Sequence, residues 1–385
     1  MSRIVVDRKI RWEHLRAQGA DLLLFSALVV VGLSYGLGYK LDWTEEDGRP
    51  EDESVEAVDV PAPASFAAVL QPAGAVLPPP AVMSPARETT MSPAAPTPSQ
   101  PVMSDAGQAA FDRMTAELGK MASRYPGRVA ITLKDMKSGR RWDYHPDDLF
   151  PAASLIKVPV LVATFYKIRE GKLSLDEKMI ISRRNRVGGS GSLKWRNDGV
   201  KLTVRELLVH MIAESDNTAT KMILDRLGMG YVQQQFPRMG LLYTGIYEDG
   251  MSIKGGRVMH ENYTTAREMT MLLEKIYKGE AVDKESSALM LQILKHPKPK
   301  ASRLAKGLPA DWEIAHKTGL LRQACHDTAL FLTPDGAYAM TVLTGQNRSY
   351  GTAKDFITKL GKVTFKTFAG PQYLAKAPAR RKTRR

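Results

Sequence analysis

The sequence predicts an α+β fold in which an antiparallel sheet is formed from both ends of the folded chain, with an inserted all-helical lobe. Three observations support this. Two strand patterns follow a first helix near residue 128, helical patterns fill the middle of the chain, and three further strand patterns come after residue 312. Strands separated in this way usually share one sheet that helices cover.

The folded body is predicted to begin near Ser104-Asp105, a helix N-cap signal before the amphipathic stretch AGQAAFDRMTAELGKMASRY. The segment RVAITLKDM follows, in which Val129, Ile131 and Leu133 alternate with other residues. This period of two predicts a strand with one buried face. A turn at 137–139 leads to the second predicted strand, GRRWDYHP.

Helical periodicity then dominates, which predicts the inserted lobe. The predicted helices cover 154–171, 203–213, 216–228, 264–278 and 283–295. The last three strands are WEIAHKT, DTALFLT and AYAMTVLTG, with a Pro-Asp-Gly turn at 334–336 between the second and the third. A final helix is predicted over 352–369.

Composition excludes several classes of protein. With 385 residues, 43% hydrophobic and 25% charged, the chain can build two domains of ordinary size and is not wholly disordered. The single Cys325 excludes an internal disulfide and a cysteine cluster, and the seven histidines show no metal-ligand spacing, so no metal or cofactor is expected. Residues 105–375 carry a net charge of +13, which suits anionic ligands or surfaces.

Residues 22–39 are predicted to form a transmembrane signal-anchor helix. No charged residue occurs from Leu22 to Gly38, and the stretch approaches the ~20 residues that span a bilayer. The preceding segment 1–21 is basic and an acidic segment follows, so the positive-inside rule predicts a cytoplasmic N-terminus and an exported body. The expected location is the bacterial cytoplasmic membrane, single-pass, with the body on the periplasmic side. A buried core helix and a cleaved signal peptide are the alternatives, although no A-x-A-like site follows.

Two further segments are expected to lack a core of their own. Residues 40–104 are first acidic and then rich in proline and alanine, with eleven of the 23 prolines in 57–104. A proline-rich segment of this kind stays extended and acts as a linker. The folded body is therefore assigned to 105–370, and the basic segment 371–385 is expected to be a disordered tail.

Ser154 and Lys157 lie three residues apart at the start of a predicted helix, hence on one face, one turn apart. A desolvated amine close to a hydroxyl can accept its proton, and a helix N-terminus favours developing negative charge. This pair therefore suits nucleophilic catalysis. A capping serine beside a surface lysine is the competing interpretation, because a chain of this length contains about one such pair by chance.

Two later motifs carry groups that could assist nucleophilic catalysis or bind a substrate. Ser215-Asp216-Asn217 lies between two helical patterns. Its serine hydroxyl can relay a proton, and its asparagine side chain can bind an amide of a substrate. Simple capping of the next helix is the alternative. Lys317-Thr318-Gly319 is expected to end the strand WEIAHKT, where a cation and a hydroxyl can hold a carboxylate and glycine permits close approach. A plain strand end with a turn glycine is the alternative there.

The three motifs together, S-x-x-K, S-D-N and K-T-G in this order, are the signature of class A β-lactamases and penicillin-binding proteins. Over roughly 105–370 the chain resembles that family. The stretch LTVRELLVHMIAESDNTATKMILDRLG, the loop 188–193, the segment 262–276 and the PDG hairpin are similar to corresponding parts of its members. The resemblance implies the β-lactamase/transpeptidase-like fold.

The resemblance also implies roles. Ser154 would be the nucleophile, Lys157 its proton acceptor and Ser215 the proton relay. The oxyanion hole would be formed by the backbone N–H groups of Ser154 and Leu320. Substrate-binding groups would be Asn217, Lys317, Thr318 and Gly319.

The loop before the helix at 264–278 departs from the family pattern. Class A β-lactamases carry a glutamate followed shortly by an asparagine there, and this glutamate activates the deacylating water. The segment LLYTGIYEDGMSIKGGRVMHENY contains no Glu-x-x-x-Asn. Glu248 is the nearest candidate, Asp249 and Glu261 are poorer ones, and a solvated loop acid is the alternative. Slow hydrolysis of the acyl-enzyme, as in penicillin-binding proteins, would result.

His326 marks a second departure, because many members place an arginine there that reaches the substrate carboxylate. A histidine is only partly charged near neutral pH, so carboxylate affinity would fall as the pH rises. Arg322 is a possible substitute, and a merely polar strand-end histidine is the alternative.

Three functions remain open at this stage. The leading one is a membrane-anchored, exported serine hydrolase that opens β-lactam amides through an acyl-enzyme on Ser154, with Lys157 as base. The second is a D-alanyl-D-alanine peptidase or an esterase, with a peptidoglycan-derived substrate. The third is a non-catalytic protein that binds the anionic envelope. An exported chain meets little nucleic acid, so no such partner is expected, and the oligomeric state is left open.

Overall fold

The structure, a computed structural model, describes residues 105–247, 250, 261–296, 301–306, 308 and 312–369. The predicted segments 1–21, 22–39, 40–104 and 371–385 lie outside the described residues, as do Glu248 and Asp249. No helix within the described ranges has the length and apolar character needed to span a bilayer.

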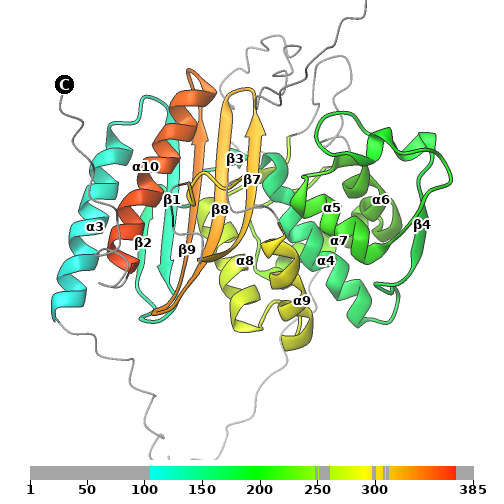
Figure 1. The fold of residues 1–385 in the computed structure, drawn as a ribbon, viewed down its shortest axis with the longest axis horizontal. Coiled ribbons are helices and arrows are strands. Elements are labelled where there is room, and N and C mark those ends of the chain that lie inside the picture. The colour runs from blue at the N-terminus through cyan, green and yellow to red at the C-terminus, as the bar shows by residue number, and fades with distance from the viewer. Residues whose placement is uncertain are drawn as a thin grey trace, which may run out of the picture. The chain divides into compact units, whose positions relative to one another are not determined.

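A five-stranded antiparallel sheet lies at the centre of the body, in the order β2-β1-β9-β8-β7 (Figure 1). Its strands are β1 (Arg128–Asp135), β2 (Arg141–Tyr144), β7 (Glu313–Leu321), β8 (Ala324–Thr333) and β9 (Gly336–Gly345). β1 pairs with β9 from Arg128 opposite Gly345 to Asp135 opposite Tyr338. Strands from both ends of the folded chain therefore meet inside one sheet, which confirms the predicted fold class.

One face of the sheet is covered by the first and last described helices, α3 (Asp105–Ser123) and α10 (Tyr350–Phe368), drawn in cyan and red in Figure 1. Val129, Ile131 and Leu133 belong to the apolar core on this side, as their alternation predicts. The ring of Tyr338 stacks against Phe331 in the same core, with 4.5 Å between centroids. This layer holds the sheet but contains none of the predicted site residues.

The other face packs against α8 (Ala266–Lys278) and α9 (Lys284–Lys295), and the helical lobe lies beside β7 (Figure 1). The lobe contains α4 (Lys157–Arg169), α5 (Val204–Ala213), α6 (Asn217–Leu227) and α7 (Met229–Met239). Short elements complete it and its connections: β3 (Phe150–Pro151) with β6 (Tyr263–Thr264), β4 (Lys178–Ile180) with β5 (Lys201–Thr203), and the 3₁₀ turns η2 (Ala153–Ile156), η3 (Arg183–Asn185) and η4 (Leu193–Trp195).

Local capping explains where five of these helices begin. The side chains of Thr203, Asp216, Thr265, Asp283 and Ser349 each accept a hydrogen bond from a backbone N–H of the first turn that follows. Such caps typically contribute about 1 kcal/mol each. They begin α5, α6, α8, α9 and α10, all of which start within two residues of the predicted position.

The helix α7 was not predicted, and two predicted boundaries differ. Pro237 lies in the last turn of α7, and Val232, Phe236 and Met239 are buried on one face of this helix. Ser154 lies in the 3₁₀ turn η2, and the α-helix itself begins at Lys157. The motif 317–319 does not end β7, since the strand continues to Leu321 through pairing with β8.

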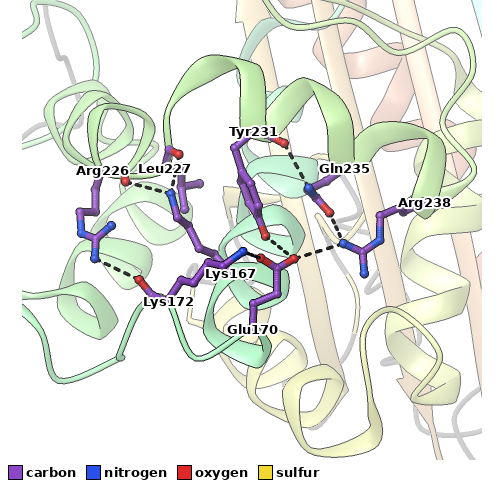
Figure 2. A network of polar contacts seen from close by, with 8 residues as sticks. All are labelled: Lys167, Glu170, Lys172, Arg226, Leu227, Tyr231, Gln235 and Arg238. Atoms are coloured by element: carbon purple, nitrogen blue, oxygen red, sulfur yellow. Dashed lines mark hydrogen bonds and ion pairs between the residues drawn. The ribbon is translucent and has the colours of Figure 1, made fainter.

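A polar network joins the far ends of α4 and α6 to α7 (Figure 2). Lys167 donates to the carbonyl oxygens of Arg226 and Leu227 at the end of α6, at 3.3 and 2.6 Å. Glu170 accepts from the hydroxyl of Tyr231 at 3.2 Å and from Lys172 at 3.0 Å. Because α4 and α6 each begin at a predicted site motif, this network fixes the two helices at the ends remote from the site.

Candidate active site

The structure brings the three motifs together between the helical lobe and β7. Lys157 Nζ lies 3.4 Å from Ser154 Oγ, 3.1 Å from Ser215 Oγ and 2.8 Å from Asn217 Oδ1. Lys317 Nζ, which comes from β7, lies 3.0 Å from the same Ser215 Oγ. The hydroxyl of Ser215 is therefore placed between two amines that are 160 residues apart in the sequence.

Two residues of this site have an unusual backbone. Ala153, next to Ser154, has φ 47°, and Ser215 has φ 56°. Non-glycine residues rarely adopt positive φ, which costs about 1–3 kcal/mol, so the surrounding structure must hold them there. Ala152 N–H donates to Asn262 O at 2.5 Å, and Asp216 N–H donates to His210 O at 3.2 Å. These bonds hold the turns that present the two serine hydroxyls.

Lys157 is fully buried, at 0% exposure. Burial lowers the pKa of Lys157 well below its ordinary value of 10.5, and the positive charge of Lys317 lowers it further, while Asp216 opposes the shift. The amine is therefore easily deprotonated in the folded protein. It also donates to the backbone oxygen of Ser215, which orients it.

Lys317 is buried as well, at 2% exposure. Its pKa is lowered to about 7, first by burial and then by the charge of Arg303, while the charge of Asp327 opposes the shift. Lys317 thus remains a cation below about pH 7 and loses its charge above it. A cation at this place can attract a carboxylate or stabilise negative charge on a bound molecule.

The glycine-rich loop 188–193 packs directly against the S-D-N motif. Asn217 donates through Nδ2 to Gly188 O at 2.9 Å, and Asp216 Oδ2 accepts from Leu193 N–H at 2.8 Å. Gly191 has φ 101°, and a Cβ atom at this residue would overlap with the backbone and carboxylate of Asp216. Only glycine therefore permits this approach of the loop to the site.

The remaining residues of the third motif lie on the edge strand β7. A Cβ atom on Gly319 would lie 3.1 Å from Ala153 Cβ, so the strand passes close to the turn that carries Ser154. Thr318 is half-buried, and Leu320 is 44% exposed. Their places are compatible with the predicted carboxylate and oxyanion contacts, which stay predictions.

His326 does not have the environment that its predicted role requires. It is fully buried, Nε2 lies 2.8 Å from Pro151 O, and Nδ1 accepts from Thr344 N–H at 3.2 Å. Burial lowers the pKa of His326 to about 4, so the ring is neutral at physiological pH. The prediction of a partly charged histidine that holds a substrate carboxylate is wrong, because both ring nitrogens are engaged by the backbone.

Arg303 was missed by the sequence analysis. It lies in the short segment 301–306, donates through Nη1 to His326 O at 3.0 Å, and lowers the pKa of Lys317 by its charge. Its backbone N–H and that of Leu304 are bound by the carboxylate of the fully buried Asp327. No local pattern surrounds Arg303, so only the packing of this segment against β8 reveals it.

Glu248, the predicted candidate for the deacylating carboxylate, lies outside the described residues, so its role stays a prediction. Glu261 is described and partly buried, and burial raises its pKa. The charge of Asp216, which is buried beside the site, acts on Lys157 and opposes the lowering of its pKa. Within the same residues, no group of three or more His, Cys, Asp or Glu side chains is arranged to hold a metal ion.

Comparison with known families agrees with this arrangement. Residues 113–368 match the model of the "Beta-lactamase enzyme family". The match covers all three motifs and nearly the whole described body.

Individual relatives are distant but extensive in coverage. Beta-lactamase VEB-1 of Pseudomonas aeruginosa is 22% identical over 274 residues, which cover 66% of this chain and 90% of that protein. Beta-lactamase AER-1 of Aeromonas hydrophila is 25% identical, over 63% of this chain and 81% of the other. The chain spans 66% of the length of extended-spectrum beta-lactamase PER-1 of Pseudomonas aeruginosa, at 23% identity.

The chain is also similar to solved structures of PBP-A and of class A beta-lactamases. A variant of PBP-A, captured as an acyl-enzyme complex with penicillin G, is 28% identical, with a TM-score of 0.61 and coverage of 67% of this chain and 97% of that chain. An ancestral class A beta-lactamase is 26% identical, with a TM-score of 0.60 and coverage of 66% and 100%. Both kinds of protein share the fold described above.

Proposed function

Because the chain belongs to the β-lactamase enzyme family, as a serine hydrolase of the β-lactamase type, we propose that it opens β-lactam amides through an acyl-enzyme on Ser154. One observation supports this most directly: a buried amine with a lowered pKa, Lys157 Nζ, lies 3.4 Å from the hydroxyl of Ser154. The proposed reaction is an acyl transfer to that hydroxyl.

In the proposed acylation, Ser154 Oγ attacks the carbonyl carbon and its proton passes to the neutral amine of Lys157. The two N–H groups of that amine are directed to Asn217 Oδ1 and to the backbone oxygen of Ser215, which leaves its lone pair for the proton. As the C–N bond breaks, Ser215 Oγ gives its proton to the leaving nitrogen and takes up the proton that Lys157 received from Ser154. Lys157 is then neutral again, Ser215 is again a hydroxyl, and an ester remains on Ser154. The hydroxyl of Ser215 is suited to this relay because it lies 3.1 Å from Lys157 Nζ.

Substrate binding is assigned to the β7 side of the site and to the helical lobe. Lys317 and Thr318 would hold the substrate carboxylate, with Gly319 leaving room for it, and Asn217 would bind the side-chain amide. The backbone N–H groups of Ser154 and Leu320 would stabilise the oxyanion. Removing one such donor typically raises the activation barrier by ~3–4 kcal/mol.

A D-alanyl-D-alanine peptidase is the second candidate, and one observation favours it. The loop segment 240–262 contains no Glu-x-x-x-Asn. An enzyme that lacks a deacylating carboxylate would acylate normally and hydrolyse the ester slowly. The similarity to PBP-A, at 28% identity, supports this alternative.

We also propose that the body is exported and tethered to the cytoplasmic membrane through residues 22–39. The uncharged stretch from Leu22 to Gly38, with basic residues before it and acidic ones after it, supports this location. A substrate in the cell envelope, either a β-lactam or a peptidoglycan fragment, would then reach the site.

Intact-mass spectrometry after mixing the purified protein with a penicillin tests the proposal. A mass increase equal to the penicillin, on the peptide that contains Ser154, is expected. A persistent adduct would favour the peptidase, and rapid nitrocefin turnover would favour the β-lactamase. If neither an adduct nor turnover is observed, both candidate functions are contradicted.

The pH dependence of kcat/KM is expected to be bell-shaped for a penicillin. Activity should rise with pH as Lys157 loses its proton, and fall above about pH 7, because Lys317 then loses the charge that attracts the carboxylate. Kinetics measured over the whole pH range in which the protein stays folded would follow these limbs. Lys317→Arg keeps a charge at all these pH values and should remove the alkaline limb; an unchanged limb in this variant would show that another group titrates.

A further inference from the structure

The segment from β4 to β5, residues 178–203, concentrates positive charge beside the site. It contains seven basic side chains and one acidic one, so it holds almost half of the net charge of 105–375. The basic residues are Lys178, Arg183, Arg184, Arg186, Lys194, Arg196 and Lys201. The acidic residue, Asp198, is paired with Arg186 at 2.6 Å.

Most of these charges face solvent without a partner. Arg183, Arg184 and Arg196 are exposed, and none of them forms an ion pair with a described residue. Lys178 and Lys201 are also exposed, on the paired strands β4 and β5. Like charges gathered in this way repel one another and attract anions, so the surface suits an anionic partner.

This surface is continuous with the catalytic site. Val187 N–H donates to Thr218 Oγ1 at 3.1 Å, in the first turn of α6. Asn217 N–H donates to Ser190 O at 3.1 Å, and Lys194 Nζ donates to the carbonyl oxygen of Gly189. The same loop therefore contacts the S-D-N motif and carries the basic side chains at its two ends.

An aromatic side chain lies within the charged surface. Trp195 is 80% exposed, the most exposed of the large apolar residues described, and Lys194 Nζ lies 5.2 Å from its ring centroid. A rigid aromatic ring held in water gives a flat apolar contact surface for a sugar ring, and tryptophan is typical of binding surfaces. Exposed cations beside such a ring suit a glycan that carries carboxylates.

We propose that the 178–203 segment binds the anionic glycopeptide part of a polymeric substrate whose acyl group enters the site at Ser154. This proposal rests on the proposed function, which it extends from the reacting amide to the polymer that carries it. A membrane surface is less suitable as the partner, since a bilayer on this segment would cover the loop that borders the site. The bound polymer would instead run along that border toward Ser154.

The test compares a triple variant, Arg183→Gln with Arg184→Gln and Arg196→Gln, with a matched control on α10. The control, Lys359→Gln with Lys362→Gln and Lys366→Gln, removes three exposed charges from the far face of the sheet. Co-sedimentation with purified insoluble peptidoglycan measures binding at low and high salt. The first variant should bind at least tenfold more weakly, the control should bind as the unchanged protein does, and high salt should reduce the difference.

Trp195→Ala and vesicles of anionic phospholipid complete the design. Trp195→Ala should weaken peptidoglycan binding severalfold at both salt concentrations. Equal binding by the triple variant and its control, or binding to vesicles in preference to peptidoglycan, would overturn the proposal. Acylation of Ser154 by a small penicillin should stay within twofold in all these variants. Absence of acylation in the unchanged protein, with polymer binding retained, would instead contradict the proposed function.

Discussion

Replacing Lys157 by methionine is expected to slow the acylation of Ser154 by roughly 10²- to 10⁴-fold, the usual contribution of a general base. Methionine fills a similar buried space but cannot accept a proton. No other described amine lies within hydrogen-bonding distance of Ser154 Oγ. Single-turnover mixing with a penicillin, quenched and followed by intact mass, measures the rate of adduct formation.

Stability and a second variant separate this effect from misfolding. The lowered pKa of Lys157 means that the unfolded chain binds the proton more tightly, so burial of this lysine costs stability below its ordinary pKa. Lys157→Met should therefore unfold at no lower temperature than the unchanged protein. Ser154→Ala should form no adduct at all. Acylation of Lys157→Met within tenfold of the unchanged rate would exclude Lys157 as the base.

Gly191→Ala is expected to lower kcat/KM by about 10²-fold, which is the effect of displacing a site by about 1 Å. The new Cβ atom would overlap with the backbone of Asp216, and a side-chain rotation cannot relieve a backbone contact. Either the loop or the S-D-N motif must move, and Asn217 with it. The free energy of unfolding should also fall by more than ~2 kcal/mol, because the positive φ of 101° is unfavourable for alanine. Steady-state kinetics and urea unfolding measure the two effects.

Gly199→Ala is the matched control in the same segment. Gly199 has φ 84°, and a Cβ atom there would meet no atom within 4 Å. This variant should lose only about 1 kcal/mol, the backbone cost, and keep full activity. If the two variants lost the same stability and neither lost activity, the close approach of Gly191 to Asp216 would have no role in the site.

Features that depend on neighbouring residues were predicted correctly. The alternation at Val129, Ile131 and Leu133 placed a strand, and helical periodicity placed most of the helices, because these signals act within a few turns or one strand. The helix α7 was missed. It contains Pro237, which normally breaks helices, and it forms through burial of Val232, Phe236 and Met239 on one face. β7 was predicted too short because its last residues are ordered by pairing with β8.

By itself, the sequence determined the class of fold, the order of the main strands and of most helices, and the three motifs that carry the proposed chemistry, because each is written in local patterns. The tertiary structure alone decided the charge states of the site. Desolvation by distant segments lowers the pKa of Lys157 and of Lys317, and makes His326 a neutral structural residue. Burial depends on what packs around a side chain in space, and residues such as Arg303 exert their charge across the fold rather than along the chain.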